Sequence, residues 1–231
     1  MFKTFIHQPL YNIFISLANL LPFLDAGGII ILFTLIVRVI LFPLSKKAFI
    51  SQIEMKKIQP KIDEIKKKFS NEKEIQAKKI MEAYSESKTN PFSGILVLFI
   101  QIPIIFGLYY TLIKSGLPEI NAGFLYEIVS NPGPIGLTIF GIPLVSNGNV
   151  IIALLAGITS YIQIHLSSLN QPQLGNEMMA KMMKIQMRVM FPIIAFIVSW
   201  QIGGVIGIYW TASNIFTILQ DLYFRKKINL A

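Results

Sequence analysis

The sequence predicts an all-α, polytopic membrane protein with five transmembrane helices, and three observations lead to that prediction. Hydrophobic residues make up 53% of the 231 residues, and the charged residues, only 14%, lie in clusters. Several apolar runs reach the roughly 20 residues that a helix needs to cross a bilayer. A soluble chain of this length would spread its charges over the surface, so we expect a single membrane domain, 1–231.

The first segment, 1–27, is expected to be an amphipathic helix that lies in the membrane interface. Asn12, Ser16 and Asn19 recur at helical spacing opposite large apolar residues, and Pro22 ends the pattern. A secretory signal peptide fits poorly because no A-x-A-like cleavage site follows. The alternative is a short uncleaved anchor.

The remaining chain divides into apolar runs and the polar segments between them. In order, we expect a first span at 28–45, a helical hairpin at 46–90, a second span at 92–113, a loop at 114–148, a third span at 149–167, a linker at 168–187, a fourth span at 188–201, a fifth at 204–224 and a short tail at 225–231.

The hairpin segment, 46–90, is expected to lie outside the membrane as two antiparallel helices. It carries twelve lysines against seven acidic residues. Its apolar residues Ile58, Ile62, Ile65 and Phe69 nevertheless keep helical spacing. This narrow apolar stripe favours a helical pair over a merely solvated charged loop.

The distribution of basic residues predicts the topology. The hairpin, the linker and the tail are rich in Lys and Arg, whereas 115–148 contains neither. Because short cytoplasmic loops carry the excess of positive charge, these basic segments are expected in the cytoplasm. Five spans then place the N-terminus outside and the C-terminus in the cytoplasm.

Arg38 is the main candidate functional residue because it interrupts the apolar run of the first span. An arginine at mid-span costs about 2.5 to 3.5 kcal/mol on insertion scales, so it should face protein or water. Thr34, Arg38 and Ser45 are expected on one helical face. The alternative is a snorkelling anchor whose charge reaches the membrane surface near Lys46.

Other spans also carry polar residues, namely Gln101, Thr159, Gln163, Thr211, Asn214 and Thr217. Such residues normally face the interior of a bundle or a wet cavity. We therefore expect a hydrated intramembrane cavity with a fixed positive charge, which would favour acidic client segments. The alternative is that these residues form hydrogen bonds that hold the helices together.

Composition and motifs argue against most other classes of function. The chain has no cysteine and only two distant histidines, so no metal site is expected. No phosphate-binding, dinucleotide-binding or hydrolase motif occurs, so we expect neither an enzyme nor a cofactor. The net charge of +9 comes mostly from lysines beside the expected membrane spans, so it does not favour specific nucleic-acid binding.

Several stretches, taken together, resemble the YidC-type membrane insertases of the Oxa superfamily. They are a first span with Arg38 that ends in FPL, the steps Gln59-Pro60 and Asn90-Pro91, LFIQIPIIFGLYYTL at 98–112, MMAKMMKIQ, and the final FPIIAFIVSW and GIYWTASNIFTILQ. The likeness covers nearly the whole chain in order. It resembles the short form of the family, with no signal-like first span and no large extracellular domain.

This resemblance implies an insertase and chaperone in a bacterial plasma membrane that inserts membrane proteins alone or with a Sec translocon. It implies a groove open to cytoplasm and lipid, lined by Arg38, Gln101, Gln163, Trp210 and Asn214, to which the sequence pattern adds Thr34 and Thr211. The implied partners are nascent membrane-protein clients, the Sec translocon, the ribosome and the lipid bilayer, with client recruitment by the hairpin. The alternative function is a small solute transporter or channel with an anion site at Arg38.

Overall fold

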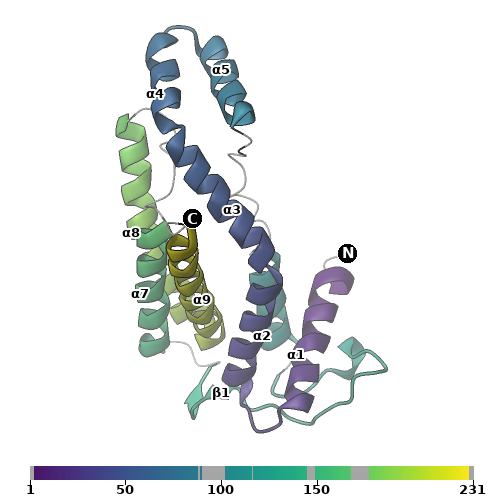
Figure 1. Ribbon diagram of the computed structural model, residues 1–231. Helices are drawn as coiled ribbons and strands as arrows, with labels where there is room; N and C mark the ends of the chain where they lie inside the picture. The colour runs from purple at the N-terminus through teal and green to yellow at the C-terminus, as the bar shows by residue number, and fades with distance from the viewer. Residues whose placement is uncertain are drawn as a thin grey trace.

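Helices dominate the computed structural model, which describes residues 3–87, 89, 102–115, 117–144, 149–167 and 177–228. The helices α4 and α5 lie at one end of the molecule, and the loop that carries the short strand β1 lies at the other (Figure 1). Between these ends, α1, α2, α7, α8 and α9 form the body of the protein.

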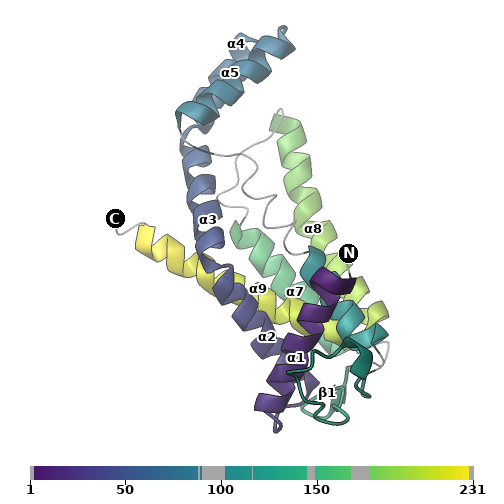
Figure 2. The same cartoon turned by 90° about the vertical axis from the view of Figure 1, so that its right-hand side faces the viewer.

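The N-terminal helix α1 (Gln8–Leu20) follows the π-turn η1 (Lys3–His7) and packs alongside α2 (Ala26–Ile40) (Figures 1 and 2). Its apolar face is fully buried at Tyr11, Phe14 and Ile15, which belong to the same core cluster as residues of α2. The buried face differs from the one that the polar spacing predicted, because Asn12 is buried while the apolar Ile13 and Leu20 are exposed. The interfacial position of α1 stays a prediction.

A bend of 60° separates α2 from α3 (Phe42–Lys57). Pro43 lies in the first turn of α3, where it has no N–H to donate and its ring would clash with the carbonyl of Val39 in a continuous helix. The predicted first span, 28–45, therefore consists of α2 and the beginning of α3. Consequently Ser45 does not continue the helical face of Thr34 and Arg38, which corrects the sequence-based expectation.

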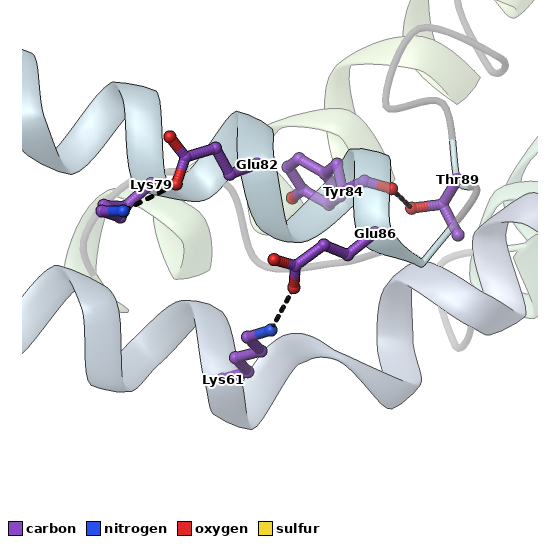
Figure 3. Close-up of polar contacts among 6 residues, drawn as sticks. All are labelled: Lys61, Lys79, Glu82, Tyr84, Glu86 and Thr89. Carbon is purple, nitrogen blue, oxygen red and sulfur yellow. Dashed lines mark hydrogen bonds and ion pairs between the residues drawn. The ribbon is translucent and has the colours of Figure 1, made fainter.

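The basic segment folds into α4 (Gln59–Lys68) and α5 (Lys73–Glu86), which pack side by side. A small apolar cluster holds them together, with Ile62 from α4 and Tyr84 from α5 almost fully buried. At the surface, Lys61 and Glu86 join the two helices by an ion pair at 2.6 Å (Figure 3). Helix α3 connects the α4–α5 pair to the body of the protein.

The described loop, 117–144, contains one short 3-10 helix, η3 (Ala122–Phe124), and a ribbon of two strands, β1 (Thr138–Ile139) and β2 (Ile142–Pro143). The strands are antiparallel, with Ile139 opposite Ile142. The protein is predominantly helical, as expected, and this small ribbon is the one sheet among the described residues. A tight turn joins the two strands, and Gly141 permits it by adopting a positive φ of 79°.

Asn12 connects α1 to this loop. Its side-chain amide donates to the carbonyl of Phe124 at 2.7 Å, and its side-chain oxygen accepts from the amide of Tyr126 at 2.7 Å. Asn12 is 3% exposed, so both bonds are protected from water. A polar residue on the otherwise buried face of α1 thus fixes the loop to the helical body.

Three long helices complete the fold, α7 (Val150–Ser167), α8 (Glu177–Ile202) and α9 (Gly204–Ile228), and each packs against the other two. The sequence predicted a linker at 168–187, but helix α8 already begins at Glu177, because this stretch is rich in Met, Lys and Gln, which favour helix. Gly203, with a positive φ of 125°, makes the sharp turn between α8 and α9.

Two of the described helical segments, Val150–Ser167 and Ile185–Ile202, are long and apolar enough to cross a bilayer, and the bent pair of α2 and α3 would be a third. The helix Ile102–Leu112 is apolar but shorter within the described residues. The protein is thus predominantly helical with two or three candidate spans. Helix α9 has the length of a span but carries more polar residues.

We expect Asn12→Ala to lower the free energy of unfolding by about 1 to 3 kcal/mol, because it removes two part-buried hydrogen bonds to the loop, each worth about 0.5 to 1.5 kcal/mol. Thermal unfolding in detergent measures this loss. Asn19→Ala is the matched control, since Asn19 makes one exposed bond, at 2.7 Å, to the carbonyl of Ser130. Equal losses for the two variants would contradict a special role of Asn12.

For the α4–α5 pair we expect apolar packing to outweigh the surface charges. Ile62→Ala should cost about 2 kcal/mol or more of local stability, as buried truncations do. Glu86→Ala should cost less than about 1 kcal/mol, because Lys61 and Glu86 are both more than half exposed. Hydrogen exchange of the α5 amides measures both, and a larger effect of Glu86→Ala would contradict this ranking.

Candidate functional site

The Arg38 side chain reaches from α2 to α9. It is half-buried, and its Nε donates to the hydroxyl of Ser213 at 3.0 Å, while its Nη2 donates to the same hydroxyl oxygen. Ser213 is 1% exposed, so this contact lies inside the protein. The guanidinium is therefore held by a neighbouring helix, which argues against a side chain that simply extends to the membrane surface.

Asn214, the next residue of α9, makes the corresponding connection to α7. Its side-chain amide donates to the hydroxyl of Ser160 at 2.8 Å and to that of Thr159 at 3.2 Å. All three side chains are buried. Ser213 and Asn214 thus connect α9 to α2 on one side and to α7 on the other.

A second group of polar contacts joins the C-terminal part of α7 to the C-terminal part of α9. Gln163 donates to the hydroxyl of Ser167 at 3.0 Å, and that hydroxyl donates to the carboxylate of Asp221 at 2.8 Å. One turn further along α9, Arg225 donates to the carbonyl of Leu166 at 2.6 Å. Arg225 thereby connects α9 to a backbone carbonyl in the last described turn of α7.

The remaining predicted residues have different surroundings. Thr34 is almost fully buried and donates to the carbonyl of Ile30 in its own helix at 2.7 Å. Trp210 and Thr211 are half-buried on α9, and the Thr211 hydroxyl is buried without a hydrogen-bond partner. Gln101 lies outside the described residues.

Arg38 and Asn214 thus lie close together, because Arg38 bonds to Ser213, which precedes Asn214 on α9. Gln163 lies in the separate group of contacts around Asp221. Sequence reasoning did not single out Ser213, Ser160 or Ser167, which supply the hydroxyl groups at all three junctions. A single serine within an apolar helix gives little signal in one sequence. The position of Ser213 directly before Asn214, in the predicted polar stretch of the fifth span, is the one hint available.

These contacts form a line of polar groups through an otherwise apolar body. The outer faces of α7 and α8 expose large aliphatic side chains, among them Ile151, Leu154, Ile158, Ile193 and Ile197. Aliphatic outside and polar inside is the arrangement expected in a lipid environment. Among the described residues, no group of three or more His, Cys, Asp or Glu side chains could hold a metal ion.

A helical body with apolar outer faces, candidate spans and an interior arginine defines a multi-pass membrane protein. The sequence comparisons place it more closely. The model of the family described as 60Kd inner membrane protein matches residues 18–230, so the chain belongs to this family. The family comprises non-enzymatic membrane insertases, and the resemblance stated from the sequence is confirmed.

Relatives of known name agree with this assignment. The chain is 31% identical over 201 residues to a protein of Fusobacterium nucleatum named membrane protein insertase YidC, a match that covers 87% of this chain and 86% of the relative. Proteins of the same name from Tolumonas auensis and Citrifermentans bemidjiense are each 31% identical over 96% and 87% of this chain. The chain spans only 36% and 34% of the length of these two relatives.

We expect Asn214→Leu to destabilise the packing of α9 against α7 by about 0.6 to 1.7 kcal/mol, the range found for hydrogen bonds between membrane helices. Thr211→Val is the matched control on the same helix. Because the Thr211 hydroxyl has no partner, its removal should be neutral or stabilising. Thermal unfolding in detergent measures both, and a larger loss for Thr211→Val would contradict the assignment.

Proposed function

We propose that this protein inserts integral membrane proteins into the bilayer and assists their folding. The observation that supports this best is the arginine held inside the apolar body by α9, in a chain whose relatives are named membrane protein insertases. The bilayer and membrane-protein clients are then the partners of the protein. No nucleotide or cofactor is required by this proposal.

The physical task of an insertase is to lower the cost of moving polar groups across hydrocarbon. Moving an unpaired peptide or charged group into hydrocarbon costs several kcal/mol or more. Interior groups at Arg38, Gln101, Gln163, Trp210, Thr211 and Asn214, with Thr34 beside Arg38, would offer a hydrated groove in which the client's polar segment is partly solvated. The positive charge of Arg38 would favour segments that carry carboxylates.

We further propose five spans, with the N-terminus outside and the C-terminus in the cytoplasm. The bent α2–α3 pair, the segment that contains Ile102–Leu112, and helices α7, α8 and α9 would be these spans. The basic residues Arg225, Lys226 and Lys227 at the end of α9 and the lysines of α4 and α5 support this orientation. The loop 117–144 would then lie outside.

In this orientation the α4–α5 pair would project into the cytoplasm. Its connection through α3 and its small apolar cluster suit a role in receiving clients before insertion. Cooperation with the Sec translocon and with the ribosome is part of the same proposal. Apolar side chains exposed on α5, Ile75 and Met81, offer contacts for a hydrophobic client segment.

The test is insertion of a client with one span and an acidic translocated tail into liposomes that contain only this protein. Protection of the tail from protease is the readout. We expect the wild type to insert the client, and Arg38→Ala to insert it at least tenfold more slowly, since the loss of one charge contact of about 1.4 kcal/mol gives that factor. Arg38→Lys keeps the charge and should retain part of the activity.

Two results would contradict the proposal in different ways. Equal insertion by the wild type and Arg38→Ala would show that the charge is dispensable. Insertion no better than in empty liposomes would reject unaided insertion. Uptake of a small anion that depends on Arg38 would instead support the transporter function.

A further inference from the structure

The ribbon of β1 and β2 carries an exposed aromatic side chain at its tip. Phe140 is 92% exposed, and Gly141 follows it in the turn between the strands. Both residues have a positive φ, 49° and 79°, which is the geometry of a type I′ hairpin turn. Asn, Asp or Gly usually occupies the first of these positions, because a bulky side chain is strained there. The needs of the turn therefore do not explain the aromatic ring.

The backbone of the tip is fixed to the start of α2. One oxygen of the Asp25 carboxylate accepts from the amide of Gly28 at 2.9 Å, and the other accepts from the amide of Phe140 at 2.9 Å. A single side chain thus caps α2 and holds the turn. Ile139 also packs closely on α2, because a Cβ at Gly27 would collide with its side chain. The ring of Phe140 therefore extends outward from a backbone that is held in place.

The ribbon lies at the end of the body where α2, α7 and α9 begin (Figure 1). It contacts α2 directly, and Leu144, which follows β2, is fully buried. A Cβ at Gly204, the first residue of α9, would lie 3.4 Å from Leu144 and 2.9 Å from Ile152 in the first turn of α7. Since α7 and the α2–α3 pair are candidate spans, the ribbon lies at the level where these helices would leave the bilayer.

The surroundings of the tip suit lipid better than a protein partner. The ribbon segment, 138–143, carries no charged side chain. A second exposed ring, Phe23 at 79%, lies two residues before Asp25, within about 7 Å of it along the chain. We call Phe23 and Phe140 the aromatic rim. Two rings of about 150 to 250 Å² each fall short of the roughly 800 Å² that each partner of a specific protein interface buries, whereas a lipid interface accepts single aromatic side chains.

We propose that the aromatic rim inserts into the lipid interface at this end of the molecule and anchors the ribbon there. The partner is the boundary between headgroups and acyl chains, into which apolar side chains reach about 5 to 10 Å. Because the ribbon contacts the start of α2 and packs beside that of α9, the anchor fixes the depth of both helix ends. The inference goes beyond the proposed function and requires only that α7 and the α2–α3 pair cross the membrane.

Tryptophan fluorescence in liposomes tests the position of the rim. The two native tryptophans are removed by Trp200→Phe and Trp210→Phe, and either Phe140→Trp or Glu127→Trp is added. Glu127 is the matched control, because it is exposed in the same loop and its native charge marks a position that faces water. With phosphatidylcholine brominated on the upper part of its acyl chains, we expect quenching to be at least about threefold stronger for Phe140→Trp. Phe23→Trp should be quenched in the same way.

A second measurement uses the native ring, since tryptophan itself favours the membrane interface. Hydrogen exchange of the ribbon amides is compared in lipid nanodiscs between the wild type and Phe140→Asn. Asn suits this turn better than Phe, so the substitution should not loosen the ribbon by itself. We expect exchange at 139–142 to be at least about threefold faster in Phe140→Asn, because the ring no longer holds the ribbon in the lipid.

Quenching of Phe140→Trp that is no stronger than that of Glu127→Trp would overturn the proposal, and so would exchange that Phe140→Asn leaves unchanged. Weak quenching together with an emission shift that grows with the protein density of the liposomes would assign the rim to a second copy of the chain, which also overturns it. Neither measurement uses a client. Failure of the proposed insertion activity would therefore leave the result on the rim unaffected.

Discussion

The energetic cost of an arginine within a membrane helix is the constraint on which the rest of the structure depends. Arg38 interrupts the apolar run of α2, and its guanidinium needs an acceptor that the hydrocarbon cannot supply. Ser213 supplies one, but only if α9 packs next to α2 at this depth. The position of α9 is in turn fixed by α7, through Asn214 and the pair Ser167–Asp221. One half-buried charge and the polar groups around it thus connect three helices.

Helix α9 contacts both α2 and α7, and it is less apolar than the candidate spans. Polar residues of α9 contact α2 and α7. The helix therefore has the length of a membrane span but is too polar to be a candidate span by composition. Its close approach to α8 and α7 needs a small residue, because a Cβ at Gly207 would lie 2.6 Å from the Ile152 side chain and 3.1 Å from that of Ser199. Close helix packing and interhelical hydrogen bonds therefore add to the apolar burial of Val205, Ile208 and Tyr209 in holding α9 in place.

The sequence predicted the class of fold and the importance of Arg38 because both depend on composition within a helix. Within the described residues, α7 (Val150–Ser167) lies inside the predicted third span, 149–167, because this run is almost entirely apolar. The bend at Pro43 was missed because a proline near the end of a span is read as its end. Ser213 was missed because its role depends on contact with another helix, 175 positions away in the chain, which no local pattern contains.

The interior polar residues fit two interpretations, and the structure separates them residue by residue. Asn214 is buried and bonded to Ser160, so its contacts already account for it as a connection between helices. Thr34 is likewise satisfied within its own helix. Arg38 differs, because its side chain is only half-buried. In the proposed groove, the hydrogen bonds of Asn214 and Thr34 would therefore also maintain the shape of the lining, and the half-buried Arg38 would supply its charge.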